Sequence, residues 1–133
     1  YYVVHKTIGV TVFLLVIVRL IWNRLSRRPS LDSALTSREE KLAHRAHNTL
    51  YFMMLAIPIT GFMMTSYHGY ETYFFFWEMQ PLWGQNEIYR VWGGFHKYLL
   101  PYLLYLVLGA HILGALKHQF IDKHSNAFKR MVS

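Results

Sequence analysis

Three long apolar stretches, separated by polar segments, dominate the pattern of the chain. The first, over residues 1–22, reads YYVVHKTIGVTVFLLVIVRLIW; the second covers about 38–67, and the third about 88–120. At ~1.5 Å per residue, each helix would be long enough to cross the ~30 Å hydrocarbon layer of a bilayer. The pattern predicts an all-α transmembrane helical bundle with three spanning helices, which form a single membrane domain over residues 1–133.

The segments between these stretches indicate how the helices are oriented. Residues 23–37 are polar and basic, and residues 121–133 form a basic tail, whereas residues 68–87 are aromatic and carry three Glu residues but no Lys or Arg. Lys and Arg are enriched in cytoplasmic loops. We therefore expect an inner loop at 23–37, an outer loop at 68–87 and an inner C-terminal tail. Pro58, inside the second stretch, predicts a kink.

Composition supports the membrane interpretation and excludes several kinds of chemistry. The chain is 53% hydrophobic and 17% aromatic, above ordinary usage for a soluble domain. It has no Cys, which excludes disulfides, iron–sulfur clusters and covalently attached haem from this chain. The formal charge is +7, but ten of the 14 basic residues lie in or beside the segment after the first stretch or near the end of the chain. That pattern favours a membrane lipid environment and argues against nucleic acid as a partner.

The predicted orientation also has a consequence for the start of the chain. With the loop at 23–37 inside, the first helix must begin on the outer side. We therefore expect one more helix to precede Tyr1, entering the membrane from the inside.

Two histidines are expected near the outer ends of two different helices. His5 opens the first stretch and His96 lies early in the third; Gly9 follows His5 by one turn, and Gly93 and Gly94 precede His96. Ionisable residues in spanning helices are costly and are candidates for function. Two imidazoles at equal depth, with small residues that let a flat ring approach, are what a bis-histidine b-type haem requires. We predict that His5 and His96 bind haem iron.

A third histidine, His111, predicts a second haem site closer to the inner face. It lies 15 residues after His96, which is about 22 Å along a helix, with the two side chains about 60° apart in azimuth. A kink or π-bulge near Pro101 would realign them. Within this chain the second ligand would be His44 or His47; otherwise it would come from the missing helix.

Several basic residues are candidates for binding anions near the two sites. Arg19, at the inner end of the first helix, is placed to neutralise a haem propionate, or it extends its charged end to the interface. Lys6, Arg90 and Lys97 are candidates for attracting an anionic electron donor. Each histidine also has a purely structural interpretation as a hydrogen-bonded interfacial side chain, and this is the more common role for His44 and His47 in their basic amphipathic turn.

The chain resembles the bacterial cytochrome b561 family, which are four-helix di-haem cytochromes of the inner membrane. The resemblance covers essentially the whole sequence. It is carried by VVHKTIGVTVFLLVIVRLIW, LAHRAHNTLYFMMLAIPITGFMM and FHKYLLPYLLYLVLGAHILGALKHQFIDKHSNAFKRM. Some members of this family act as superoxide oxidases that pass electrons to ubiquinone.

The resemblance implies a set of haem ligands. It makes His5 and His96 the axial pair of the outer haem, and His111 one ligand of an inner haem whose other ligand lies on a first helix absent from this sequence. It shifts His44 and His47 away from ligation. The spacing of 15 residues from His96 to His111 is one longer than the family pattern, and Pro101 marks a candidate position for the insertion.

Three functional hypotheses follow. The leading one is transmembrane electron transfer by haem b, with two haems expected, between an outer-face small-molecule or protein donor such as superoxide and membrane ubiquinone. The second is a cytochrome b subunit that anchors a larger dehydrogenase or hydrogenase through its aromatic outer loop. The third is a non-haem membrane anchor or transporter segment whose histidines relay protons.

Overall fold

The computed structural model describes residues 1–26 and 37–120. The main elements are the helices α1 (Tyr2–Leu25), α2 (Ser37–His68), α3 (Tyr89–Gly94) and α4 (Leu100–Phe120). A π-helical turn, η1 (Phe95–Leu99), joins α3 to α4, and the short strands β1 (Thr72–Phe74) and β2 (Trp77–Met79) lie between α2 and α3. Residues 27–36 of the inner loop predicted at 23–37, and the predicted tail at 121–133, fall outside the described residues.

Within the described residues, three helices are long and apolar enough to cross a membrane: α1, α2 and the continuous helix from Tyr89 to Lys117. Few of their side chains are buried, since only 6%, 22% and 6% of their most apolar windows lie inside the protein. A helix satisfies its own backbone hydrogen bonds, which is what a lipid environment requires of a spanning segment. The exposed apolar side chains are therefore the surface that faces lipid, and the predicted membrane helical bundle is confirmed.

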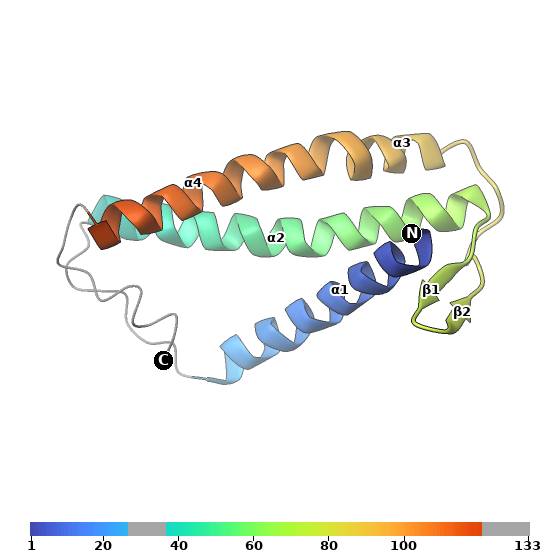
Figure 1. The fold of residues 1–133 in the computed structure, drawn as a ribbon, viewed down its shortest axis with the longest axis horizontal. Helices are drawn as coiled ribbons and strands as arrows, with labels where there is room; N and C mark the ends of the chain where they lie inside the picture. Colours follow the sequence, from blue (N-terminus) through green and yellow to red (C-terminus); the bar gives the residue numbers. More distant parts are fainter. Residues whose placement is uncertain (27–36, 121–133) are drawn as a thin grey trace.

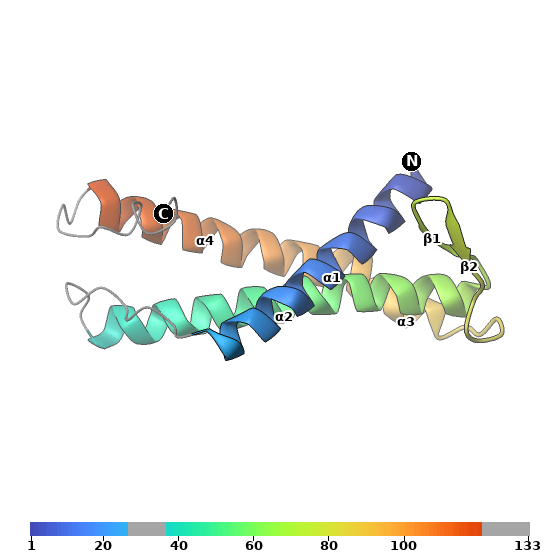
Figure 2. The same ribbon diagram turned by 90° about the horizontal axis from the view of Figure 1, so that it is seen from below.

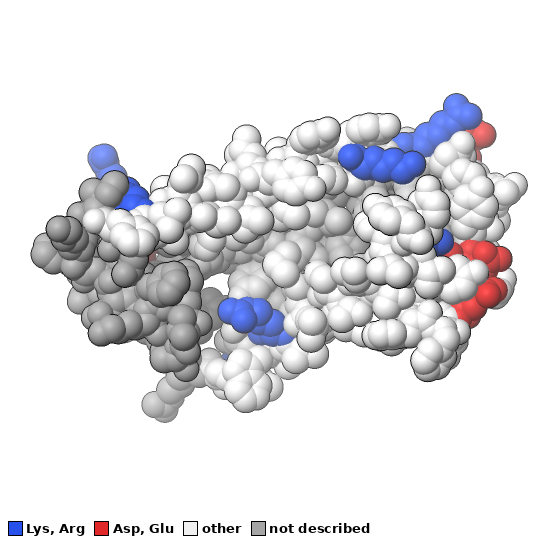
Figure 3. Space-filling model, viewed as in Figure 1, with Lys and Arg blue, Asp and Glu red and all other residues white. Residues whose placement is uncertain are grey.

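Helix α2 is the centre of the bundle. It packs against α1 on one side and against α3, η1 and α4 on the other, and in the described residues no close backbone approach joins α1 to α4. Figures 1 and 2 show α2 and α4 running side by side while α1 crosses them obliquely. Most of the face seen in Figure 3 is uncharged; the acidic side chains lie mainly at its right-hand end, and the basic ones form small separate patches, one of them near the middle of the long axis.

The third spanning helix differs from a regular α-helix at the position of His96. Pro101 has no N–H, and its ring would clash with the carbonyl of Lys97 in a regular turn. In η1 the N–H of Leu100 bonds the carbonyl of Phe95 instead, five residues earlier. A π-turn takes one residue more than an α-turn. The structure thus has a π-turn just before Pro101, where the sequence predicted a kink or π-bulge.

A β-hairpin that the sequence pattern did not predict lies within the expected outer loop. Thr72 pairs with Met79, and Phe74 pairs with Trp77, around a two-residue turn. The turn begins with Phe75 at φ 56°, a backbone conformation that costs free energy in a residue with a side chain. The hairpin lies beside the start of α1 (Figure 1). We call this end of the bundle the hairpin end.

Two hydrogen bonds attach the hairpin to α1. The N–H of Phe75 donates to Thr7 Oγ1 at 3.0 Å, and Lys6 Nζ donates to the main-chain carbonyl of Glu71. The predicted helix boundaries differ little from the observed ones: α1 ends at Leu25 rather than residue 22, and α2 covers Ser37–His68 rather than 38–67. The third predicted helix, 88–120, begins at Tyr89 and is interrupted by η1.

Candidate functional site

A cavity of about 710 Å³ opens between α1, α2 and η1 at the hairpin end. Its lining includes His5 and Gly9 from α1, Gly61 from α2, and His96 from η1. Most of the other lining side chains are apolar, and no Asp or Glu is among them. A cavity of this size, apolar with a few convergent polar groups, is typical of cofactor sites.

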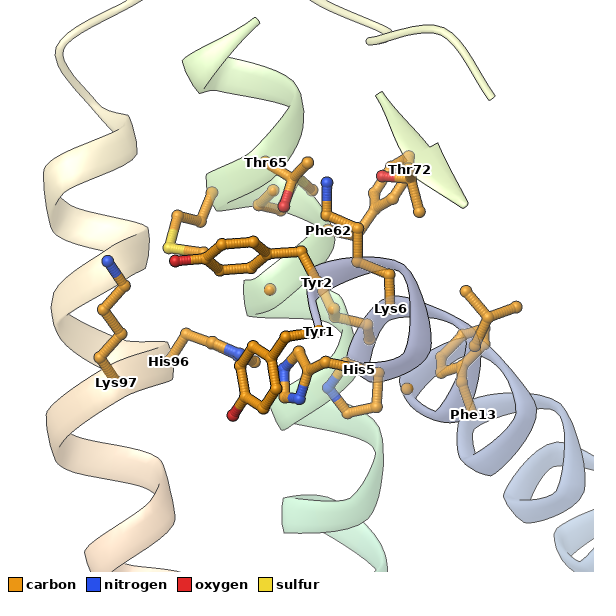
Figure 4. A pocket seen from close by; sticks show the side chains of 17 residues that line it. Tyr1, Tyr2, His5, Lys6, Phe13, Phe62, Thr65, Thr72, His96 and Lys97 are labelled. Carbon is orange, nitrogen blue, oxygen red and sulfur yellow. The ribbon is translucent and has the colours of Figure 1, made fainter. Parts of the chain in front are cut away.

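The two histidines face each other across this cavity, as Figure 4 shows. The ring centres of His5 and His96 lie 6.0 Å apart, with an angle of 76° between the ring planes. Because an imidazole nitrogen binds a transition metal at about 2 Å, two rings on opposite sides of one ion have their centres about 6 Å apart. The separation would therefore leave room for a single metal ion between the two rings.

The ring of His96 is held by α2. Its Nδ1 lies 2.9 Å from the carbonyl oxygen of Ile57 and 3.4 Å from Thr60 Oγ1. A carbonyl oxygen can only accept, so Nδ1 carries the proton and donates. The other nitrogen, Nε2, then has its lone pair free for a metal, which is the usual arrangement of a ligating histidine.

Gly61 provides the space in which the His96 ring lies. A Cβ atom at this position would come within 2.7 Å of the ring carbon Cε1 of His96. Any side chain there would displace the imidazole. By contrast, a Cβ at Gly9 meets nothing within 4 Å, so Gly9 leaves open room in the cavity. Gly93 instead packs against Met64, and neither Gly93 nor Gly94 lines the cavity.

Of the three basic residues predicted to attract an anion, two line this cavity and one does not. Lys6 and Lys97 are lining residues. Arg90 lies outside the lining and forms an exposed ion pair with Glu87 at 2.8 Å. The structure thus brings Lys6 and Lys97 together with the two histidines and separates Arg90 from them.

The opposite end of the bundle holds the remaining candidates. The ring centres of His47 and His111 lie 5.0 Å apart, which is shorter than the separation of His5 and His96. Tyr51 follows His47 by one turn of α2. Its hydroxyl accepts hydrogen bonds from Arg19 Nε at 2.9 Å and from Asn23 Nδ2 at 3.1 Å. Of the two α2 histidines considered as partners for His111, the structure therefore places His47 against it.

Four contributions to the hairpin-end site were not predicted from the sequence: Gly61, Thr60, the Ile57 carbonyl and the hydroxyl of Thr72, which also lines the cavity. Spacing along the sequence points only to glycines on the same helix as each histidine. Gly61 lies on the facing helix, and only the register between helices reveals it.

Across the described residues no group of three or more His, Cys, Asp or Glu side chains could hold a metal ion. Two imidazoles with open equatorial positions suit a metal that brings its own ring of ligands, as haem does.

Comparisons with known proteins agree with this geometry. Residues 1–133 match a family described as prokaryotic cytochrome b561. Cytochrome b561 homolog 2 of Escherichia coli (strain K12) is 26% identical over 129 residues, which cover 96% of this chain and 68% of the relative. Cytochrome b561 homolog 1 of the same organism is 27% identical over 96% of this chain and 72% of its own length. A protein named probable superoxide oxidase CybB, from Yersinia pestis, is 24% identical over 96% of this chain and 73% of its own length.

Proposed function

Because this chain belongs to the prokaryotic cytochrome b561 family of membrane b-type haem electron carriers, we propose that it takes single electrons from a donor at the hairpin end and passes them to a membrane quinone. We place the hairpin end on the outer side of a bacterial inner membrane. The donor is a small one-electron reductant such as superoxide, and the acceptor is ubiquinone.

The observation that carries the proposal is the facing pair of His5 and His96. Their 6.0 Å separation fits one iron between them, and the bond from His96 Nδ1 to Ile57 leaves Nε2 available. Haem held in this way would supply a one-electron Fe(III)/Fe(II) couple. The chain's own part is to fix the two imidazoles, to leave room through Gly9 and Gly61, and to exclude water with apolar lining residues.

A second haem is proposed toward the opposite end, with His111 as one axial ligand. His47 lies too close to His111 for an iron between the two rings in this arrangement, since 5.0 Å is below the about 6 Å that two metal–imidazole bonds require. The second ligand is therefore proposed to come from a helix that precedes Tyr1. Arg19 is proposed to neutralise a propionate of this haem.

Superoxide is favoured as the donor by the charge around the cavity and by one relative. Lys6 and Lys97 line the cavity without any acidic neighbour in its wall, so an anion is attracted toward it. The Yersinia pestis relative is named a probable superoxide oxidase. In the balanced reaction, two superoxide anions each lose one electron and leave as O2. One quinone takes up these two electrons and two protons to become the quinol.

A second candidate function is the membrane subunit of a larger dehydrogenase or hydrogenase. The observation that favours it is the aromatic tip of the hairpin, where Phe76 is 99% exposed and Trp77 is 71% exposed. Such a tip offers a docking surface for a protein partner. Gentle co-purification from native membranes separates the two candidates, because only the anchor subunit retains a cofactor-bearing partner.

The test is a haem count in the purified protein. A dithionite-reduced minus oxidised spectrum with a pyridine haemochrome assay should show a b-type α-band and about two haems per protein, falling to about one in His96→Ala. His68→Ala is the matched control, because His68 stacks on Tyr70 outside the cavity and should keep the full count. A properly assembled protein with no b-type α-band would overturn the assignment.

A further inference from the structure

One buried hydroxyl in the cavity wall has no hydrogen-bond partner in the part of the chain that the structure describes. Three buried side-chain atoms share this property: Ser66 Oγ, Thr72 Oγ1 and Trp92 Nε1. Of the three residues, Thr72 alone lines the cavity between His5 and His96, although its side chain is only 5% exposed. A buried hydroxyl without a partner is costly and calls for an explanation.

One ammonium group, that of Lys6, accompanies the Thr72 hydroxyl in the same wall. Lys97 also lines the cavity, but from η1 on the opposite side (Figure 4). Lys6 Nζ donates to the carbonyl of Glu71, the residue just before Thr72, so the end of Lys6 lies against the base of β1. Figure 4 shows Lys6 and Thr72 together at the edge of the cavity nearest the hairpin, beyond the two histidine rings.

The chemistry of Lys6 and Thr72 selects the kind of ligand group that binds beside them. An ammonium group has three N–H donors and no acceptor, and a threonine hydroxyl donates one hydrogen bond. No Asp or Glu lines the cavity to accept from them. The complementary group is an anion with several acceptor oxygens, and a carboxylate that reaches the cavity as part of a ligand fits this description.

We propose that Lys6 and Thr72 form a carboxylate-binding subsite that holds a propionate of the haem between His5 and His96. This inference rests on the proposed function. It makes the hairpin part of the cofactor site, because β1 supplies Thr72. The proposal also gives the unpartnered Thr72 hydroxyl a hydrogen-bond acceptor. Attraction of superoxide over a distance would not need this hydroxyl, because a neutral group adds nothing to long-range attraction.

The subsite should affect both the retention of haem and its reduction potential. A hydrogen bond to a carboxylate is stronger than one between neutral groups, so its loss should speed haem dissociation on the order of 10-fold. Without the donor, the propionate charge is less well compensated near the iron. That charge favours Fe(III) over Fe(II), and the reduction potential of this haem should fall.

The experiment compares Thr72→Val with Ser66→Ala in the full-length, haem-loaded protein. Valine keeps the shape of threonine and removes the hydroxyl. Ser66 is the matched control because its hydroxyl is also buried and without a partner in the described residues, but it does not line the cavity. Two quantities are measured at one fixed pH: the rate of haem transfer to apomyoglobin and the midpoint potential by redox titration. Thr72→Val should change both, and Ser66→Ala neither.

Each alternative result contradicts the inference in a different way. Unchanged transfer and potential in haem-loaded Thr72→Val would mean that the hydroxyl does not contact the propionate. An altered salt dependence of superoxide turnover with unchanged haem retention would assign the subsite to the substrate anion instead. If Thr72→Val does not assemble, Lys6→Gln is tested in its place, with faster haem transfer as the required result. A wild-type protein without haem would overturn the proposed function itself, and this is measured first.

Discussion

The Nδ1 atom of His96 lies 2.9 Å from the carbonyl oxygen of Ile57, and Gly61, one turn further along α2, leaves room for the ring. This relationship fixes the tautomer and the orientation of the imidazole from a neighbouring helix. Thr60 Oγ1 adds a bond of 2.9 Å to the same carbonyl. The main chain of α2 therefore positions His96 more directly than any residue of its own helix does.

The first prediction concerns the space that Gly61 leaves. In Gly61→Ala the new Cβ would lie 2.7 Å from Cε1 of His96, a distance that forces the ring to move. We expect the displaced ring to lose its bond to Ile57 and its alignment with His5. The haem content should fall by about half if two haems are bound, measured by pyridine haemochrome.

Gly109→Ala is the control for this prediction. Gly109 lies in α4, and a Cβ there meets nothing within 4 Å. Alanine is also the better helix former, so this variant should assemble with its full haem content. Equal haem content in the two variants would show that the His96 ring does not need the space beside Gly61.

The second prediction tests whether His111, and not His47, is a ligand of the second haem. Their ring centres are 5.0 Å apart, whereas those of His5 and His96 are 6.0 Å apart and leave space for an iron. We expect His111→Ala to lose the second haem and His47→Ala to keep it. The measurement is the number of haems per protein together with the low-spin signals in electron paramagnetic resonance. A loss of haem in His47→Ala equal to that in His111→Ala would identify His47 as the missing ligand.

The sequence pattern predicted the membrane helices well because lipid imposes a simple rule. A spanning segment must be long, apolar and internally hydrogen-bonded, and each of these properties is visible in one sequence. The pairing of His5 with His96 could also be predicted from the sequence, because two residues at equal distance from the outer ends of their helices lie at equal depth in the membrane. The structure places these two rings on opposite sides of one cavity, with their planes at 76° to each other.

Features that depend on the register between helices could not be predicted in the same way. Gly61 contacts His96 only because of how α2 and η1 are aligned, and sequence spacing along either helix does not contain that information. The hairpin was missed for a different reason. Its turn places Phe75 at φ 56°, where Gly or Asn would be the usual signal, so no turn motif marks it. Arg90 was grouped with Lys6 and Lys97 by sequence proximity, but its ion pair with Glu87 lies outside the cavity.

The third prediction compares these basic residues in the proposed reaction with superoxide. Lys97 lines the cavity, and the charge of Arg90 is balanced by Glu87 at 2.8 Å. We expect Lys97→Gln to lower the rate with superoxide by roughly 2- to 5-fold at low ionic strength, with the difference fading as salt screens the charge. Arg90→Gln should change the rate less, because it removes one member of an exposed pair. Pulse radiolysis over a range of ionic strength measures both, and equal effects of the two variants would exclude steering by the cavity wall.

The last prediction concerns how firmly the hairpin is attached to α1. Thr7 Oγ1 accepts a hydrogen bond of 3.0 Å from the N–H of Phe75, at the strained residue of the turn. Thr7→Val removes this acceptor without changing the size of the side chain. The loss of one such bond is worth about 0.5–1.5 kcal/mol, so the Phe75 amide should exchange with solvent several-fold faster.

Hydrogen exchange followed by mass spectrometry of the 69–80 segment measures this effect. Thr11→Val is the matched control, because Thr11 Oγ1 donates to the carbonyl of Thr7 within α1 at 2.8 Å and not to a group of the hairpin. It should leave exchange in the hairpin unchanged. If Thr7→Val also leaves exchange unchanged, the hairpin is held by the bond from Lys6 to Glu71 and by its own strand pairing. Thr72 would then keep its place in the cavity wall without help from Thr7.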